Sequence, residues 1–174
     1  YPTISDKLHL SPIGINIDRF KEAEAAPVTQ DSPTIVFSGS MNSRLNIDAV
    51  SWFVGEVFPD VKKSIPDCQF LIVGHNPTQE VKQLATVEGV KVTGRVEKTE
   101  PYIVGADLVV IPPRGGAGVK IKLLEGLAAE KLVLTTDYGI SGTEITPGEE
   151  VLHANTESTF AQKAISAINS PDDY

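Results

Sequence analysis

Short apolar runs alternate with helical patterns along most of this 174-residue chain, and this alternation restricts the fold more than any other feature. Strands are expected at residues 34–37, 69–73, 90–93, 108–111, 132–135 and 151–152. Helices are expected at residues 47–61, 78–85, 101–104, 119–129 and 157–169, most of them with apolar residues three and four positions apart. Continuous apolar strands belong to parallel sheets that helices cover on both faces. The chain is therefore predicted to be an α/β protein with a doubly wound, mostly parallel, six-stranded Rossmann-like sheet in the order 3-2-1-4-5-6.

Two of the expected helices have distinctive residues. In the first, Asn46 is a candidate N-cap, and Pro59 is expected to kink or end the regular part. In the helix after residue 118, Ile121 and Leu124 are expected to face the core.

Composition restricts the class of protein. The length suits one domain, which we expect at residues 34–174 after a linker at 1–33, and the absence of an initiator Met indicates a piece of a longer protein. The formal net charge of −8 argues against a nucleic-acid partner. The single cysteine, Cys68, suits a reducing, cytoplasmic location and is expected to be a small buried residue. Three scattered histidines give no metal-ligand spacing, and no apolar run is long enough to span a membrane.

Four loops are candidates for a binding site because each follows a predicted strand. They cover residues 39–44, 94–98, 112–119 and 137–143, and all are polar or contain glycine. In doubly wound sheets, ligands bind at the carboxyl ends of the strands. We therefore expect a ligand site where these loops meet.

The loop at 112–119 carries the strongest chemical signal. Gly115, Gly116 and Gly118 connect a strand to a helix, where backbone N–H groups and the helix dipole favour a diphosphate. The loop matches neither Walker A nor the dinucleotide fingerprint, so a flexible connector is the alternative interpretation. Arg114 is the preferred phosphate ligand, whereas Lys120 and Lys122 would ordinarily lie on a solvated helix face.

Glu125 stands in an otherwise apolar helix just after this loop. An ionised carboxylate can accept hydrogen bonds from both hydroxyls of a ribose, and Gly126 beside it permits close approach of a neighbouring strand or a ligand. The alternative is an ordinary glutamate that is exposed or paired with Lys122, three residues earlier.

From about residue 10 to residue 169, the chain resembles the C-terminal half of retaining glycosyltransferases of family 4, group 1, which have the GT-B architecture. Five blocks in order carry the resemblance. The blocks are Ser11–Phe20, Phe37–Met41 with Asn46, Val92–Val96, Ala106–Pro112 and Gly116–Glu125. The resemblance implies transfer of a sugar from a nucleoside-diphosphate sugar to a saccharide or lipid-linked acceptor with retention, without a metal or other cofactor. It also implies a missing N-terminal acceptor domain and allows peripheral membrane association of the full enzyme.

The resemblance assigns roles to individual residues. Glu125 would bind the ribose, Gly94, Arg95 and Val96 would contact the base, and the glycine loop would hold the diphosphate and sugar. No catalytic residue is assigned. The predicted substrate-binding residues are Gly39, Ser40, Arg44, Gly94, Arg95, Val96, Arg114, Gly115, Gly116, Ala117, Gly118, Lys122 and Glu125.

The chain departs from the family pattern at three positions. Ala117 stands where the family has the first of two glutamates, and Ser40 and Leu45 stand where its first loop has arginine and lysine. Arg44 is the nearby candidate to replace these cations, and Arg114, Lys120 and Lys122 are further candidates. The departures leave two alternatives open: a non-catalytic nucleotide-binding module of the same fold, or a doubly wound protein-interaction domain.

Overall fold

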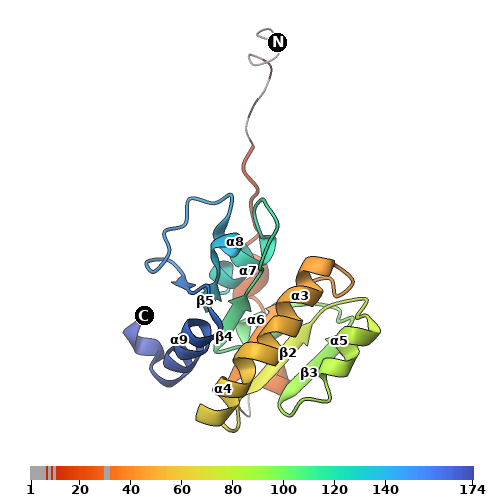
Figure 1. The fold of residues 1–174 in the computed structure, drawn as a ribbon. Helices are drawn as coiled ribbons and strands as arrows, with labels where there is room; N and C mark the ends of the chain where they lie inside the picture. Colours follow the sequence, from red (N-terminus) through yellow and green to blue (C-terminus); the bar gives the residue numbers. More distant parts are fainter. Residues whose placement is uncertain (1–6, 8, 10, 30–31) are drawn as a thin grey trace.

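The computed structural model describes residues 7, 9, 11–29 and 32–174, so predictions for the masked positions at the N-terminus and at 30–31 lie outside it. Six parallel strands form one sheet in the order β3-β2-β1-β4-β5-β6 (Figure 1). The predicted fold class and strand order are thus confirmed.

The elements alternate as the sequence pattern indicates. The strands are β1 (Thr34–Ser38), β2 (Gln69–Val73), β3 (Val90–Gly94), β4 (Leu108–Ile111), β5 (Leu132–Thr135) and β6 (Leu152–His153). The α-helices are α2 (Asp18–Lys21), α3 (Arg44–Trp52), α4 (Phe58–Ser64), α5 (Gln79–Leu84), α6 (Glu100–Val104), α7 (Ile121–Ala128), α8 (Asp137–Ile140) and α9 (Glu157–Asn169). Short 3-10 turns lie at Pro27–Thr29 and Pro171–Asp173.

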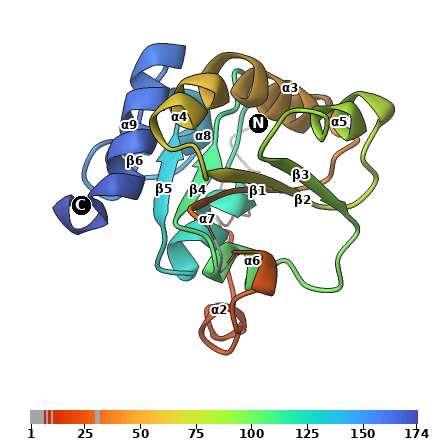
Figure 2. The ribbon, with the colours of Figure 1, turned by 90° about the horizontal axis from the view of Figure 1, so that it is seen from below.

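Two apolar layers form because successive strand residues point to opposite faces of the sheet. On one face, Phe37 and Phe70 pack with side chains from α3, α4, α5 and α9. On the other face, Val36 and Val109 pack with side chains from α2, α6 and α7. Figure 2 shows these two helix layers on either side of the strands.

The first long helix differs in detail from its prediction. It begins at Arg44 after Ser43, so Asn46 lies within the first turn and is not the N-cap. A π-helical turn at Phe53–Val57 separates α3 from α4, and Pro59 lies in the first turn of α4. The regular α-helix is interrupted before Pro59 and continues through it to Ser64, so Pro59 does not end the helix.

The buried face of α7 was predicted only in part. Ile121 is 52% exposed, and the buried residues of the helix are Leu123 and Gly126. The apolar residues of this helix form two overlapping stripes at helical spacing, so the pattern alone does not select one. A Cβ at Gly126 would lie 2.8 Å from Cγ2 of Val133, which confirms the predicted close approach to a strand.

Part of the segment predicted as a linker packs against the domain. Phe20 in α2 is buried in the second apolar layer, and the amide of Ala26 donates to the carbonyl of Pro101. Nε of Arg19 donates to Oε1 of the buried Glu100 at 2.6 Å.

Two further properties concern only the described part of the chain. None of its helices is long and apolar enough to cross a membrane. Its His, Cys, Asp and Glu side chains form no group of three or more that could hold a metal ion.

Cys68 is expected to be unreactive in the native protein. It is fully buried next to β2, and burial raises the pKa of its thiol to about 12. Only the thiolate is a strong nucleophile, so a disulfide reagent such as DTNB at pH 8 should label Cys68 only after unfolding. Rapid labelling in native buffer, at a rate similar to that in denaturant, would contradict the buried position.

Candidate nucleotide-binding cleft

A cleft of about 820 Å³ opens at the carboxyl ends of the strands. Its walls come from the segments that follow β1, β2 and β3 and from residues 119–125, which follow β4. It is lined by Ser38, Gly39, Ser40, Asn46, Gly74, His75, Asn76, Arg95, Val96, Thr99, Val119, Lys120, Ile121, Lys122 and Glu125. This is the edge of the sheet at which the loop arrangement predicts a ligand.

Glu125 enters the cleft from α7 as a half-buried carboxylate. Burial raises the pKa of its carboxyl group, while Lys122, Arg19 and a hydrogen bond with the hydroxyl of Ser38 act in the opposite direction. The ion pairs of the described residues do not include Lys122 with Glu125. The carboxylate is therefore available to accept hydrogen bonds from a ligand.

Lys122 lies one turn earlier on the same side of α7. Its ammonium group donates to Oδ1 of Asn46 at 2.8 Å and lies 3.8 Å from the centre of the Phe37 ring. Burial lowers the pKa of this amine, Glu125 raises it and Lys120 lowers it, and the net result is a pKa of about 7. Lys122 thus has neutral contacts in place of the predicted ion pair.

The floor of the cleft is a close contact between two backbones. The amide of Gly39, just after β1, donates to the carbonyl of Val73 at 2.9 Å. A Cβ at Gly74 would lie 1.7 Å from the carbonyl oxygen of Gly39, and Gly74 has a φ of +152°. Only glycine fits at position 74, so the ends of β1 and β2 meet without a side chain between them.

The cleft brings together six of the residues predicted to bind substrate. They are Gly39, Ser40, Arg95, Val96, Lys122 and Glu125. Gly94 ends β3 with a φ of +68° and directly precedes Arg95 and Val96 in the chain.

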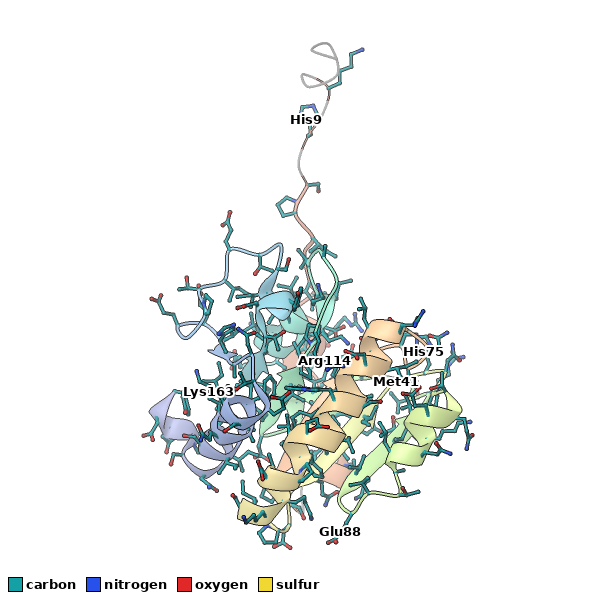
Figure 3. All side chains as sticks on the ribbon, in the orientation of Figure 1. His9, Met41, His75, Glu88, Arg114 and Lys163 are labelled. Atoms are coloured by element: carbon teal, nitrogen blue, oxygen red, sulfur yellow. The ribbon has the colours of Figure 1, made fainter. Side chains whose placement is uncertain are left out.

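The predicted cations Arg44 and Arg114 lie elsewhere. Both line a separate hollow of about 290 Å³ against α3. Figure 3 shows Arg114 beside α3. The Nε of Arg114 donates to Oδ2 of Asp48 at 3.0 Å, and the two side chains form an ion pair. In this structure the favoured phosphate ligand is therefore directed to a carboxylate on α3 and away from the cleft.

The glycine loop lies beside the cleft and does not line it. Gly115, Gly116, Ala117 and Gly118 are absent from the lining residues of the cleft. A Cβ at Gly116, where φ is +91°, would lie 2.8 Å from Cδ1 of Leu45. At the position where the family pattern has a lysine, Leu45 thus makes an apolar contact with the loop.

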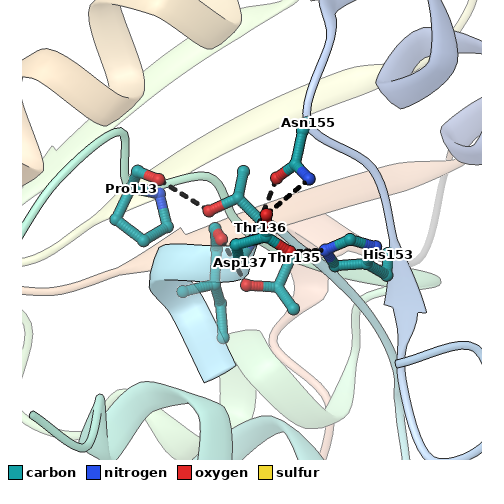
Figure 4. A network of polar contacts seen from close by, with 7 residues as sticks. Pro113, Thr135, Thr136, Asp137, His153 and Asn155 are labelled. Carbon is teal, nitrogen blue, oxygen red and sulfur yellow. Dashed lines mark hydrogen bonds and ion pairs between the residues drawn. The ribbon is translucent and has the colours of Figure 1, made fainter. Parts of the chain in front are cut away.

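A network of polar contacts joins residues at the ends of β4, β5 and β6, next to the glycine loop (Figure 4). The hydroxyl of Thr136 donates to the carbonyl of Pro113 at 2.6 Å. Beside it, Asp137 contacts Nε2 of His153 at 2.6 Å and accepts from Nδ2 of Asn155 at 2.9 Å. These contacts tie the ends of β4, β5 and β6 together, so they support the loop and do not themselves face the cleft.

Sequence reasoning missed the contribution of the loop after β2. His75 and Asn76 line the cleft, and Asn76 has a positive φ of 54°. Gly74 at the end of a predicted strand was the available signal, since the other candidate loops also begin near a glycine. Ser38, Asn46 and Thr99 were missed because their roles depend on contacts across the sheet edge.

Comparisons with known proteins place this geometry in context. Residues 32–170 match the family described as Glycosyl transferases group 1. A protein of Klebsiella pneumoniae, described as an uncharacterized 44.6 kDa protein in the cps region, is 27% identical over 139 residues. The aligned part covers 75% of this chain and 36% of that protein.

Solved structures share the fold at low sequence identity. A glycosyltransferase from Rickettsia africae matches with a TM-score of 0.71 and 19% identity, over 95% of this chain and 48% of that chain. The Anabaena protein HepE, solved in complex with UDP and glucose, matches with a TM-score of 0.68 and 12% identity. That match covers 91% of this chain and 46% of HepE, so the chain spans slightly less than half of each of these structures.

Proposed function

Because the chain belongs to the group 1 glycosyltransferase family, we propose that it is the donor-binding half of an enzyme that transfers a hexosyl group from a nucleoside-diphosphate sugar with retention. The acceptor is a saccharide or a lipid-linked saccharide, held by a further domain of the same protein. The relative described as lying in a cps region supports a role in polysaccharide synthesis.

The observation that carries the proposal is the half-buried carboxylate of Glu125, which faces a large cleft without an ion-pair partner among the described residues. A carboxylate without an ion-pair partner suits the vicinal hydroxyls of a ribose because its oxygens can accept hydrogen bonds from both. The cleft also has the size of a small-molecule site.

The remaining walls suit the other parts of a nucleotide sugar. Arg95 and Val96, which follow β3, offer their backbone and side chains to the base. Gly39 and Ser40, which follow β1, line the same cleft and offer their backbone to the diphosphate. Stabilising the negative charge on the departing nucleoside diphosphate is the contribution of this half to transfer.

A non-catalytic nucleotide-binding module is the second candidate. It is favoured by Ala117, Ser40 and Leu45, which stand where the family pattern has a glutamate and two cations. Assay of the full protein with a panel of nucleotide sugars separates the candidates, since turnover is expected only for the transferase.

The test of donor binding is calorimetric titration of the 174-residue chain with UDP, GDP and ADP. UDP is the first probe because HepE was solved with it. We expect binding of at least one ribonucleotide, and at least about fivefold weaker binding of its 2′-deoxy form, which lacks one hydroxyl for Glu125. The absence of heat with every nucleotide at millimolar concentration would favour a protein-interaction domain, and equal affinity for ribo and deoxy forms would contradict the ribose role.

A further inference from the structure

The family pattern has an arginine and a lysine in the loop after β1, where this chain has Ser40 and Leu45. Lys122 lies next to this loop. Its ammonium group is so close to that loop that a Cβ at Gly39 would lie 2.8 Å from Nζ. The loop itself offers Ser40 at the cleft, and Leu45 packs on the glycine loop. The amine from α7 therefore reaches across the cleft to the end of β1.

The present contacts of Lys122 are weak substitutes for an anionic partner. The amide oxygen of Asn46 and the ring of Phe37 are both uncharged, and each compensates only part of the desolvation of an ammonium group. The amine is largely enclosed at the wall of a cleft that is open on its other side. A phosphate oxygen entering from that side can supply the missing negative charge.

We propose that Lys122 is the diphosphate ligand of this domain and that it takes up a proton from solvent when the diphosphate binds. The inference rests on the proposed function and deepens it, because it assigns to α7 a contact that the family pattern places in the loop after β1. Lys122 takes the phosphate-binding role that the sequence predicts for Arg114, because Arg114 is paired with Asp48.

The charges around Lys122 support proton uptake. Burial is the largest effect on the pKa of the amine and lowers it. On its own segment, Glu125 raises and Lys120 lowers this pKa, and together the three effects give a value of about 7. Phe37 on β1 and Asn46 on α3 are uncharged, and His75 and Arg95 line the same cleft from the loops after β2 and β3. A bound diphosphate adds negative charge beside the amine and raises its pKa, so at pH 8 binding should take up about one proton per site.

The experiment is titration of the 174-residue chain with pyrophosphate and with UDP at pH 8, in buffers of different ionisation enthalpy. The observed heat then gives the number of protons taken up. Pyrophosphate tests the anion contact without any base, so the result does not depend on which nucleotide the domain prefers. Between pH 7.5 and pH 8.5, wild-type affinity should fall by about tenfold because the free amine must first be protonated.

Three variants separate the role of Lys122 from general charge effects. Lys122→Met should weaken pyrophosphate binding by about 10- to 100-fold and abolish proton uptake. Lys122→Arg should keep binding but lose proton uptake and the pH dependence, since a guanidinium is always charged. Lys163→Met, on α9 away from the cleft, removes the same formal charge and should leave both quantities unchanged.

The outcomes distinguish this inference from the proposed function. Unchanged pyrophosphate affinity or proton uptake in Lys122→Met, or no pyrophosphate binding by the wild type, would overturn the role of Lys122. Pyrophosphate binding through Lys122 with no preference for any nucleotide would instead retain the anion contact and remove the donor-binding function. Melting curves identify a variant that fails to fold, and Lys122→Arg then provides the decisive proton count.

Discussion

Replacement of Glu125 by alanine is expected to weaken binding of the preferred nucleotide by about 5- to 150-fold, which corresponds to about 1–3 kcal/mol. The loss arises because two ribose hydroxyls are left without the carboxylate that accepts them in the cleft. The measurement is calorimetric titration of the variant beside the wild type at the same pH and ionic strength. Unchanged affinity would remove Glu125 from the site.

The control for this prediction is the free energy of unfolding of the Glu125→Gln variant. Burial raises the pKa of the Glu125 carboxyl group in the folded chain, so this group favours folding at low pH. That stability is lost as the pH rises from the unfolded value through the raised folded value, because the buried carboxylate must then ionise. Glu125→Gln should therefore weaken nucleotide binding while leaving the free energy of unfolding at pH 7 unchanged or higher. A large fall in stability would instead indicate a structural role.

Replacement of Gly74 by alanine is expected to destabilise the domain by about 2–6 kcal/mol. The new Cβ would lie 1.7 Å from the carbonyl oxygen of Gly39, and the φ of +152° is one that side-chain-bearing residues rarely adopt. Because the obstacle is backbone, neither strand can relieve it by a change of rotamer. Thermal unfolding should show a fall in Tm of roughly 5–20 °C.

Gly115→Ala provides the comparison within the glycine loop. A Cβ there would meet nothing within 4 Å, and Gly115 does not have a positive φ. Its Tm should remain within about 2 °C of the wild type, since surface changes of this kind are nearly neutral. Equal stability of the Gly74 and Gly115 variants would contradict the close contact between the ends of β1 and β2.

Continuous apolar strands and strongly periodic helices were predictable from the sequence. The run at 69–73 coincides with β2 and the pattern at 157–169 with α9. Both signals are local, since each depends on the spacing of apolar residues within a single element. The strand order followed because parallel strands joined by right-handed crossovers leave few arrangements.

The site was predicted only in part, because its details depend on residues far apart in the chain. Glu125 was identified from its isolated charge in an apolar helix, and it faces the cleft. Arg114 was favoured from its position in the loop, but it pairs with Asp48, 66 residues earlier. Lys122 was predicted to bind substrate, but as a weaker phosphate candidate than Arg114, and its enclosure by Phe37 and Asn46 was not foreseen. The pattern of neighbouring residues in the sequence does not indicate contacts between residues so far apart in the chain.

The strand order also has a consequence for the order of events during synthesis. β1 lies between β2 and β4, and its amide at Thr34 donates to Asp107, 73 positions later in the chain. A nascent chain that has emerged only as far as β3 therefore exposes one unpaired edge of β1, a strand that is buried throughout in the folded domain. Such an edge can join other chains, and long-range parallel pairing is slow to form. We therefore expect the first half of this domain to be most prone to aggregation until β4 leaves the ribosome.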